Sequence, residues 1–470
     1  MSSMSDWEPV IGLEVHAHLK TRTKMFCRCE LEYGAPENAR TCPVCLAHPG
    51  ALPVANGKAI ELTIALGLAL GCEIAERSVF ARKNYFYPDL PKGYQISQYE
   101  APLCGPGELV VQTAGGSERV GIVRAHLEED AAKTVHAGGA TGRSVGADYS
   151  LVDFNRGGTP LLEIVSEPDI RSAEAALRYL RLLRQTIVEL GVSDAEMEKG
   201  TMRADVNVSV RKRGEEGYRP RWEIKNMNSF TFIGRAIEAA VRQQVAAHEA
   251  GEEVGQSTYD YDPDTDRLTA HRSKEEADDY RYFPEPDLVP LAPPAELVAR
   301  LRAAQPELPA ARIARYADAI GFERADELVM TGNEANAVLL VGAGLDLDTA
   351  ATVSMNQLAG RALPAGNAAP LAEVVRAGNL TREALNAAFA AATERPIDAA
   401  EFLAQTAVSD ESALAPAIDA VIAAHPDQVA TYLGGKEGVL GFLVGQVMRE
   451  TGGKADPAVV NRLLRERLRT

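Results

Sequence analysis

The 470-residue sequence contains no uninterrupted apolar run of the length that a membrane span requires. A transmembrane helix needs about 18 or more apolar residues, whereas Glu61 and Glu73 interrupt the most apolar window, residues 60–75. That window predicts a buried helix instead. The N-terminal segment also lacks the basic start and the apolar stretch of a secretory signal. We therefore expect a cytoplasmic protein with no membrane partner.

Cysteine is scarce, and positive charge is in the minority. Six cysteines in 470 residues are too few for a disulfide scaffold. With 49 basic and 66 acidic residues the formal charge is −17. This argues against a protein that binds nucleic acid over its whole surface, because phosphate binding depends on Lys and Arg. Any contact with RNA must be local. The hydrophobic share of 46% and the charged share of 24% are those of an ordinary folded chain.

Proline and charge divide the chain. Five prolines crowd residues 284–294, where neither a helix nor a central strand can use them. Strand-like alternation mixes with helices before this segment, and helical spacing dominates after it. Residues 401–430 hold five acidic and no basic residues, whereas residues 431–470 hold seven basic and four acidic ones. We predict a first domain over 1–293, a helical domain over 294–403 and a small helical tail domain over 404–470.

The first domain carries signals of both helix and strand. Residues 172–191 predict an amphipathic helix with Ser172 as its N-cap and Gly191 just past its end. Residues 201–211 alternate strictly between apolar and polar side chains, which is typical of a strand with one buried face. Residues 120–130 repeat this pattern. The sequence therefore predicts an α+β fold in which an antiparallel sheet has helices behind it and a polar front.

Four of the six cysteines have the spacing of a metal site. They are Cys27, Cys29, Cys42 and Cys45. Two close pairs of thiolates suit tetrahedral zinc, and an all-cysteine site leaves no open position for a substrate. We predict a structural zinc knuckle; the alternative is four unrelated buried cysteines. Cys72 and Cys104 have no such partners, so we expect them to be small buried hydrophobes.

Acidic residues gather near the ends of predicted strands. Glu14 and His16 are two residues apart, so on a strand both project from one face. Glu128, Glu129 and Glu163 follow similar apolar segments. Carboxylates are the ligands that Mg²⁺ prefers, with His as an occasional addition. Taken singly, each acid could equally be a solvated surface group, but a carboxylate among apolar neighbours, as Glu163 is, costs more to bury.

Basic residues interleaved with Asn, Tyr and Gly form a third pattern. The residues suited to balance phosphate charge or to donate hydrogen bonds to a nucleotide include Lys83, Asn84, Arg156, Arg203 and Lys225. No Walker A motif is present, which excludes a P-loop ATPase. Kinase motifs and the GxSxG elbow of serine hydrolases are also absent from the sequence.

Several strings together resemble one family. They include VIGLEVHAHL, RKNYFYPDLPKGYQISQ, HLEEDAAK, DFNRGGTPLLEIVSEPDI, MRADVNVSV, EIKNMNSF and DDYRYFPEPDL. In this order they resemble the B subunits of the bacterial and organellar glutamyl/aspartyl-tRNA amidotransferases. The resemblance implies a catalytic cradle similar to the glutamine synthetase/guanidino kinase fold. It also implies that ATP phosphorylates the side-chain carboxylate of a misacylated Glu or Asp on tRNA and that ammonia then displaces the phosphate.

The resemblance also implies roles for residues. The segments that bind magnesium in the family contain Glu14, His16, Glu128, Glu129 and Glu163. Which of Glu128 and Glu129 is a direct metal ligand is left open. The catalytic set is Glu14, His16, Glu128, Glu163 and Lys225. The ATP- or substrate-binding set is Lys83, Asn84, Arg156, Arg203, Asp205 and Asn207. The tail would reach tRNA through Lys454, Arg462, Arg465 and Arg469.

The implied cofactors are ATP, Mg²⁺ and a structural Zn²⁺, although the cysteine knuckle is not found in every member. The implied partners are an amidase A subunit that supplies ammonia, a small C subunit and misacylated tRNA(Gln) and/or tRNA(Asn), in a heterotrimer. The sequence carries no amidase signature of its own, so glutamine hydrolysis belongs to another subunit.

Two other functions compete with this interpretation. A non-catalytic tRNA-binding scaffold would explain the zinc knuckle and the basic tail but not the clustered acids. A stand-alone metallohydrolase would explain the acids but not the tail. Asp456 and Pro457 suit the N-cap and the first position of a final helix in the tail. This tail helix could also be no more than a solvated basic helix.

Overall fold

The computed structural model describes residues 4–113, 116–138, 146–272, 280–378, 380–403 and 411–469. The chain splits into two compact units, Met1–Arg312 and Ile313–Thr470. The first unit extends past the proline-rich segment because helix α4 (Ala295–Ala303) packs against α1 (Gly57–Ala69). The finer divisions after residues 293 and 403 stay predictions, and residue 404 lies outside the described residues.

An eight-stranded sheet organises the first unit, with the strand order β12-β11-β10-β9-β1-β8-β5-β4. In chain order the strands are β1 (Trp7–His18), β4 (Gly107–Thr113), β5 (Gly116–Glu129), β8 (Pro160–Ser166), β9 (Met202–Lys212), β10 (Trp222–Met227), β11 (Ser257–Asp262) and β12 (Arg267–Arg272). Every described pairing in this sheet is antiparallel except that of β10 with β11. This confirms the predicted α+β fold with a mainly antiparallel sheet.

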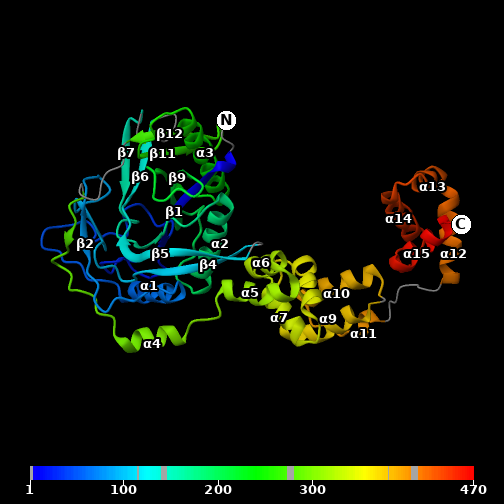
Figure 1. The fold of residues 1–470 in the computed structure, drawn as a ribbon. Helices are drawn as coiled ribbons and strands as arrows, with labels where there is room; N and C mark the ends of the chain where they lie inside the picture. Colours follow the sequence, from blue (N-terminus) through cyan, green and yellow to red (C-terminus); the bar gives the residue numbers. More distant parts are fainter. Residues whose placement is uncertain are drawn as a thin grey trace. The chain divides into compact units, whose positions relative to one another are not determined.

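Two amphipathic helices, α2 (Ala173–Glu189) and α3 (Phe230–Glu249), pack against each other and against the sheet, and Figure 1 shows them on one side of it. Helix α2 begins as predicted, because the Ser172 hydroxyl accepts a hydrogen bond from the Ala175 amide at 3.0 Å. Gly191 follows its end with a φ of +65°, a backbone conformation that favours glycine.

The alternation of β9 divides its residues between two faces. Val206 and Val208 are fully buried, and the side-chain amide of Gln244 on α3 donates to the Val208 carbonyl at 3.0 Å. The apolar face of β9 therefore packs under the helices. Asp205 and Asn207 point to the other face, where the sheet is polar.

Smaller elements complete the first unit. They are η1 (Met4–Asp6), the three-stranded sheet of β2 (Ala81–Asn84), β3 (Tyr94–Ser97) and β13 (Phe283–Pro284), and the hairpin of β6 (Lys133–Ala137) and β7 (Tyr149–Asp153). The helix expected over residues 60–75 is α1. It is capped by Asn56, whose side chain accepts from two backbone amides of the first turn. It ends six residues earlier than expected, because Gly71 adopts a φ of +63°.

The described elements of the second unit are helices, as the spacing predicted. After α5 (Pro309–Ile320), which crosses the boundary between the units, they are α6 (Phe322–Met330), α7 (Glu334–Gly342), α8 (Leu347–Thr352), the π-helical η3 (Val353–Gln357), α9 (Ala365–Ala377), α10 (Arg382–Glu394) and α11 (Ala400–Leu403). The tail holds α12 (Glu411–Ala424), α13 (Pro426–Leu433), η4 (Glu437–Val439), α14 (Leu440–Glu450) and α15 (Pro457–Arg469).

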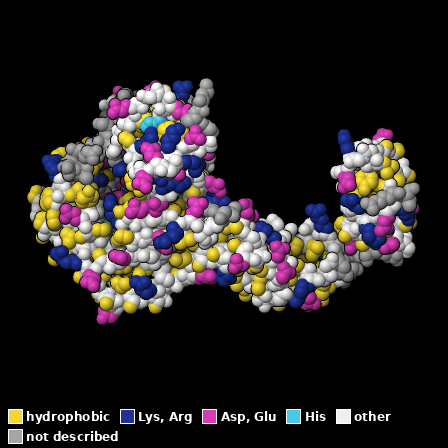
Figure 2. All heavy atoms as spheres, in the orientation of Figure 1, with side chains coloured by type: hydrophobic (Ala, Val, Ile, Leu, Met, Phe, Trp, Pro, Cys, Tyr) yellow, Lys and Arg dark blue, Asp and Glu magenta, His cyan; other side chains and the backbone are white. Residues whose placement is uncertain are grey.

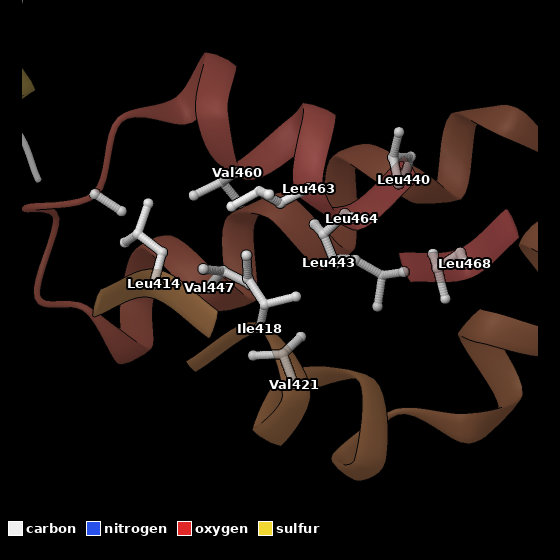
Figure 3. Packing of buried hydrophobic residues seen from close by; sticks show 11 residues of the cluster. Leu414, Ile418, Val421, Leu440, Leu443, Val447, Val460, Leu463, Leu464 and Leu468 are labelled. Carbon is white, nitrogen blue, oxygen red and sulfur yellow. The ribbon is translucent and has the colours of Figure 1, made fainter. Parts of the chain in front are cut away.

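The tail has its own apolar core, which Figure 3 shows from close by. Helices α12, α14 and α15 each supply buried side chains, among them Ile418, Leu443 and Leu464. Helix α15 begins as predicted, because the Asp456 carboxylate accepts from the Ala458 amide at 2.8 Å. Each of these three helices buries its apolar stripe against the other two.

The surface mixes charge types. On the face drawn in Figure 2, acidic, basic and apolar side chains are interspersed over each unit. Among the described residues, no helix combines the length and the apolar character needed to cross a membrane. Cys72 and Cys104 are buried, as expected.

Candidate functional site

The polar face of the sheet is centred on β1, where Glu14, His16 and His18 project to one side. Strand pairing places His16 opposite Glu163 of β8 and opposite Arg203 of β9. Because side chains alternate along a strand, these residues share the face that lies away from α2 and α3. The antiparallel register therefore brings together residues from three distant parts of the chain.

The first acidic group consists of His16, Glu128 and Glu163, whose ligand atoms lie within 4.8 Å of one another. His16 Nε2 is 3.4 Å from Glu163 Oε2 and 3.7 Å from Glu128 Oε1. His126 Nε2 approaches the same Glu163 oxygen at 3.4 Å. Three of the five predicted magnesium ligands thus meet at one point, from β1, β5 and β8.

The electrostatics of this group favour a cation. Burial and the charge of Glu163 raise the pKa of Glu128 to about 7. Burial lowers the pKa of His126 to about 4, so this imidazole is neutral at pH 7. Burial opposes charge on His16 as well, but the hydrogen bond and the charge of Glu163 raise its pKa. Two buried carboxylates beside imidazole nitrogens suit a divalent metal ion, and the residues therefore fit magnesium.

The second acidic group consists of Glu14, Asp205 and Glu223, again with ligand atoms within 4.8 Å of one another. The Asn207 amide donates to Glu14 Oε1 at 2.9 Å. The Lys225 ammonium lies 3.3 Å from Glu223 and 3.6 Å from Asp205. Three carboxylates beside one lysine keep a negative balance, so this group can also hold a divalent cation.

Glu129 is not brought into either group. Its side chain points to the opposite face of β5 from Glu128, where the Lys92 ammonium lies 2.5 Å from it and the Ile96 amide donates to it at 3.0 Å. Alternation along the strand produces this separation of neighbours. Of the two candidates left open by the motif, the structure places Glu128 beside His16 and Glu163.

The remaining predicted nucleotide or substrate residues are dispersed around this face. The positive charge of Lys83 partly offsets the rise in the pKa of Glu128. The Lys83 ammonium is 4.7 Å from the centre of the Tyr280 ring. The Asn84 amide donates to the carbonyls of Tyr280 and Arg281 at 3.1 and 2.8 Å. Asn84 therefore ties β2 to the segment that precedes β13.

Sequence reasoning missed three members of this face. Glu223 completes the second acidic group, His126 contacts Glu163, and His18 lies 2.7 Å from Asp130. Each is two residues from a predicted member on the same strand, so the period of two was a signal that could have found them. Asp130, which directly follows β5, forms ion-pair contacts with His18, Arg156 and Arg203.

The four cysteines of the predicted knuckle meet at one point. Their sulfur atoms lie within 4.8 Å of one another, with 3.9 Å between those of Cys42 and Cys45. Zinc–sulfur bonds near 2.3 Å in a tetrahedron would separate the sulfurs by about 3.8 Å. A hydrogen bond from Cys27 lowers the pKa of Cys45 to about 4, so one thiolate is already present at neutral pH. The residues therefore fit a structural metal ion.

The basic residues of the tail are partly neutralised within the domain. Arg462 pairs with Glu411 and Glu466, and Arg465 lies 3.9 Å from Glu437. Lys454 is exposed. Arg469 ends α15, but its side chain lies outside the described ones.

Two groups of carboxylates lie on one face of the sheet, with Lys225 and Arg203 beside them, and such groups can hold divalent cations. Residues 9–299 match the family described as the GatB/GatE catalytic domain, and residues 345–468 match the GatB domain.

Relatives from several bacteria match over their whole length. The B subunit of the aspartyl/glutamyl-tRNA(Asn/Gln) amidotransferase of Anaeromyxobacter dehalogenans strain 2CP-C is 48% identical over 99% of each chain. The B subunits of Geotalea daltonii and Nitratidesulfovibrio vulgaris strain DP4 are 46% and 44% identical, over 98% and 99% of this chain. The chain therefore belongs to the family of the amidotransferase B subunits, which confirms the resemblance carried by the motifs.

Proposed function

We propose that this chain uses ATP to phosphorylate the side-chain carboxylate of Glu-tRNA(Gln) and/or Asp-tRNA(Asn). Ammonia from a partner amidase that hydrolyses glutamine then replaces the phosphate, giving Gln-tRNA(Gln) or Asn-tRNA(Asn). A carboxylate is a poor electrophile at neutral pH, and phosphorylation converts one of its oxygens into a good leaving group. The chain thus acts as the part of a ligase that couples ATP cleavage to formation of a carbon–nitrogen bond.

One observation carries this proposal: the two acidic groups lie on the same face of the same sheet. Glu14 and His16 belong to different groups and are two residues apart on β1, a separation of about 7 Å along a strand. Magnesium held there would neutralise the charge of the phosphates and of the transferred phosphoryl group. Phosphoryl transfer depends mainly on such positioning and charge stabilisation.

The side chains of the chain itself divide the remaining tasks. Asn207 orients Glu14 through its hydrogen bond of 2.9 Å. Lys225 and Lys83 supply positive charge on either side of the acidic groups. Arg156 and Arg203 are the candidates to bind a phosphate or carboxylate, because a guanidinium presents two parallel N–H donors. We reassign Asp205 from the ATP- or substrate-binding set to the metal-binding set, because its carboxylate lies within 4.8 Å of those of Glu14 and Glu223.

We assign the finer features by the same reasoning. The antiparallel sheet serves as a cradle of the glutamine synthetase/guanidino kinase type, with the polar face as its floor. The four cysteines hold a structural Zn²⁺, and the tail contacts tRNA. The partners are an amidase A subunit and a small C subunit, in the cytoplasm. The B subunits similar to this chain carry both tRNA(Asn) and tRNA(Gln) in their name, and we propose both classes of substrate here.

A non-catalytic scaffold does not account for this face. Glu128 is buried, and the side chain of Glu163 beside it is only 12% exposed; holding like charges together with so little solvent is costly unless a cation or proton joins them. A protein that only bound tRNA would not need two carboxylates placed so close together.

The test is amidation by the chain together with its amidase partner, given ATP, glutamine and misacylated tRNA. We expect Glu163→Gln to lower the rate of amidation by about a thousandfold or more, because a metal ligand that stabilises transferred charge is lost. Binding of tRNA should change little. Glu238→Gln, on the exposed outer side of α3, is the matched control and should amidate normally.

The contrary results are equally clear. If Glu163→Gln amidates at the normal rate in saturating Mg²⁺, the acidic face is not the reaction centre. If the complex consumes no ATP while it amidates, the phosphorylation step is wrong.

A further inference from the structure

A third charged cluster adjoins the first acidic group and has a different character. Its centre is Asp130, which directly follows β5 and whose side chain is 6% exposed. Asp130 Oδ2 lies 2.7 Å from His18 Nε2 and 3.5 Å from Arg156 Nε, and Oδ1 lies 3.6 Å from Arg203 Nη2. The Ala131 amide also donates to Oδ1 at 3.0 Å. One buried carboxylate thus faces two guanidinium groups and an imidazole.

The charges of this cluster do not cancel. An arginine stays protonated in proteins, so Arg156 and Arg203 contribute two positive charges against the single negative charge of Asp130. Counted over Asp130, Arg156 and Arg203 alone, the cluster carries one net positive charge, although the charges of Glu128 and Asp205 also act on Arg203.

The negative and the positive groups of this cluster differ in their exposure to solvent. The carboxylate lies at the base of the cluster, whereas the side chains of Arg156 and Arg203 are 42% and 29% exposed. The backbone also fixes the Arg156 guanidinium, since it donates hydrogen bonds to the carbonyls of Ala131 and Ala132 at 2.9 and 2.7 Å. Fixed, partly open guanidinium groups above a buried carboxylate form a preorganised receptor for an anion.

The position of the cluster links it to the reaction centre. Arg203 lies opposite His16 in the pairing of β1 with β9, so the two side chains share one face of the sheet. His18 follows His16 by two residues on the same face of β1. An anion on Arg156 and Arg203 would therefore lie beside a cation held by the first acidic group.

We propose that Asp130 organises His18, Arg156 and Arg203 into a subsite for the phosphate that leaves during amidation. This inference rests on the proposed function for the origin of its ligand. In that step the nitrogen of ammonia bonds to the acyl carbon and the bond from this carbon to the phosphate oxygen breaks. The phosphate departs with the bonding electron pair. Two hydrogens stay in the amide, and the third ends on the phosphate as HPO₄²⁻.

The test is a titration of the full-length chain with inorganic phosphate in the presence of Mg²⁺, followed by calorimetry. No ATP, tRNA or amidase is added, so the result does not depend on turnover. We expect one phosphate per chain for the unaltered protein. Arg156→Gln and Arg203→Gln should each weaken the affinity by about tenfold or more, because each removes a charge-assisted pair of hydrogen bonds. Arg119→Gln, a strongly exposed arginine of β5 paired with Glu108, is the control and should bind normally.

Two outcomes overturn the subsite: no saturable phosphate binding by the unaltered chain, or unchanged affinity in Arg156→Gln. If Arg203→Gln does not fold, the more exposed Arg156 decides alone. Failure of the proposed function would look different, since the complex would not amidate while its phosphate binding stayed intact.

Discussion

At the scale of single residues, the neighbouring charge decides what a buried acid of the sheet does. Glu128 and Glu129 are neighbours in sequence and both are buried. Glu129 is neutralised by Lys92 at 2.5 Å, whereas Glu128 meets Glu163 and has its pKa raised to about 7. The first is a satisfied structural ion pair. Glu128, in contrast, lies beside a like charge that a bound cation would neutralise.

The raised pKa of Glu128 predicts a pH-dependent gain in stability when it is replaced. The folded value of about 7 lies above the ordinary 4.5, so the folded chain binds more protons between these values and loses stability as pH rises through them. In magnesium-free buffer, Glu128→Gln should match the unaltered chain at pH 5 and exceed its free energy of unfolding by about 1–3 kcal/mol at pH 8. Denaturant unfolding at both pH values measures this. A difference that is the same at both would contradict it.

Gly67 shows how close packing restricts a single position. A Cβ atom there would lie 2.5 Å from Cys104 Sγ and 3.1 Å from Ile74 Cδ1. Gly67→Ala should therefore destabilise the first unit by about 1–3 kcal/mol, although alanine favours a helix. Gly441→Ala in α14 meets no atom within 4 Å and should stabilise the tail by about 0.5–1 kcal/mol. Thermal unfolding of both variants checks the opposite signs.

At the scale of elements, the cysteine knuckle holds a loop of the functional face. Asn38 and Arg40, between the two cysteine pairs, hydrogen-bond to Asp153 and Asn155 through their backbone amides at 3.0 and 2.7 Å. This contact fixes the segment that leads from β7 to Arg156. The knuckle thus acts on the face through backbone position and not through chemistry of its own.

Replacing one knuckle cysteine should separate stability from chemistry. We expect Cys42→Ser to lose its one equivalent of zinc and to melt several degrees lower, because a structural metal contributes its binding free energy to folding. Below its melting temperature the variant should still amidate in the complex. Cys72→Ser, outside the cluster, should keep zinc in elemental analysis. Full zinc content in Cys42→Ser would refute the site.

At the scale of the whole molecule, an acidic chain must confine its RNA contacts. Residues 431–470 hold seven basic and four acidic residues, yet Arg462, Arg465 and Arg467 each pair with a carboxylate of the same domain. Truncation from residue 431 would remove α14 and α15 and with them most of the tail core. Charge substitution on the intact tail is therefore the sharper experiment.

The double variant Lys454→Gln/Arg465→Gln should weaken tRNA binding and flatten its salt dependence. Each phosphate contact that is lost lowers the slope of log affinity against log salt by about 0.7–0.9. Binding is measured at several salt concentrations with the complete amidotransferase complex. Arg300→Gln, an exposed arginine of α4, is the control. An unchanged affinity and slope would show that α15 is merely a solvated basic helix.

Local patterns determined the elements of this protein. The alternation of β9, the caps at Ser172 and Asp456 and the spacing of the four cysteines each depend on neighbours in the chain, so the sequence predicted them correctly. The end of α1 was misjudged, because the left-handed Gly71 stops the helix while apolar residues continue.

Only the tertiary structure decided which of these residues meet. Alternation shows which side chains of one strand share a face, but the order and register of strands depend on how the whole sheet packs on its helices. A register shift between Ile122 and Arg124 helps set the pairing of β5 with β8, in which His126 lies opposite Glu163. The strand order likewise puts Glu223 beside Glu14 through β9. Such encounters join residues far apart in the chain, and a local pattern contains no information about them.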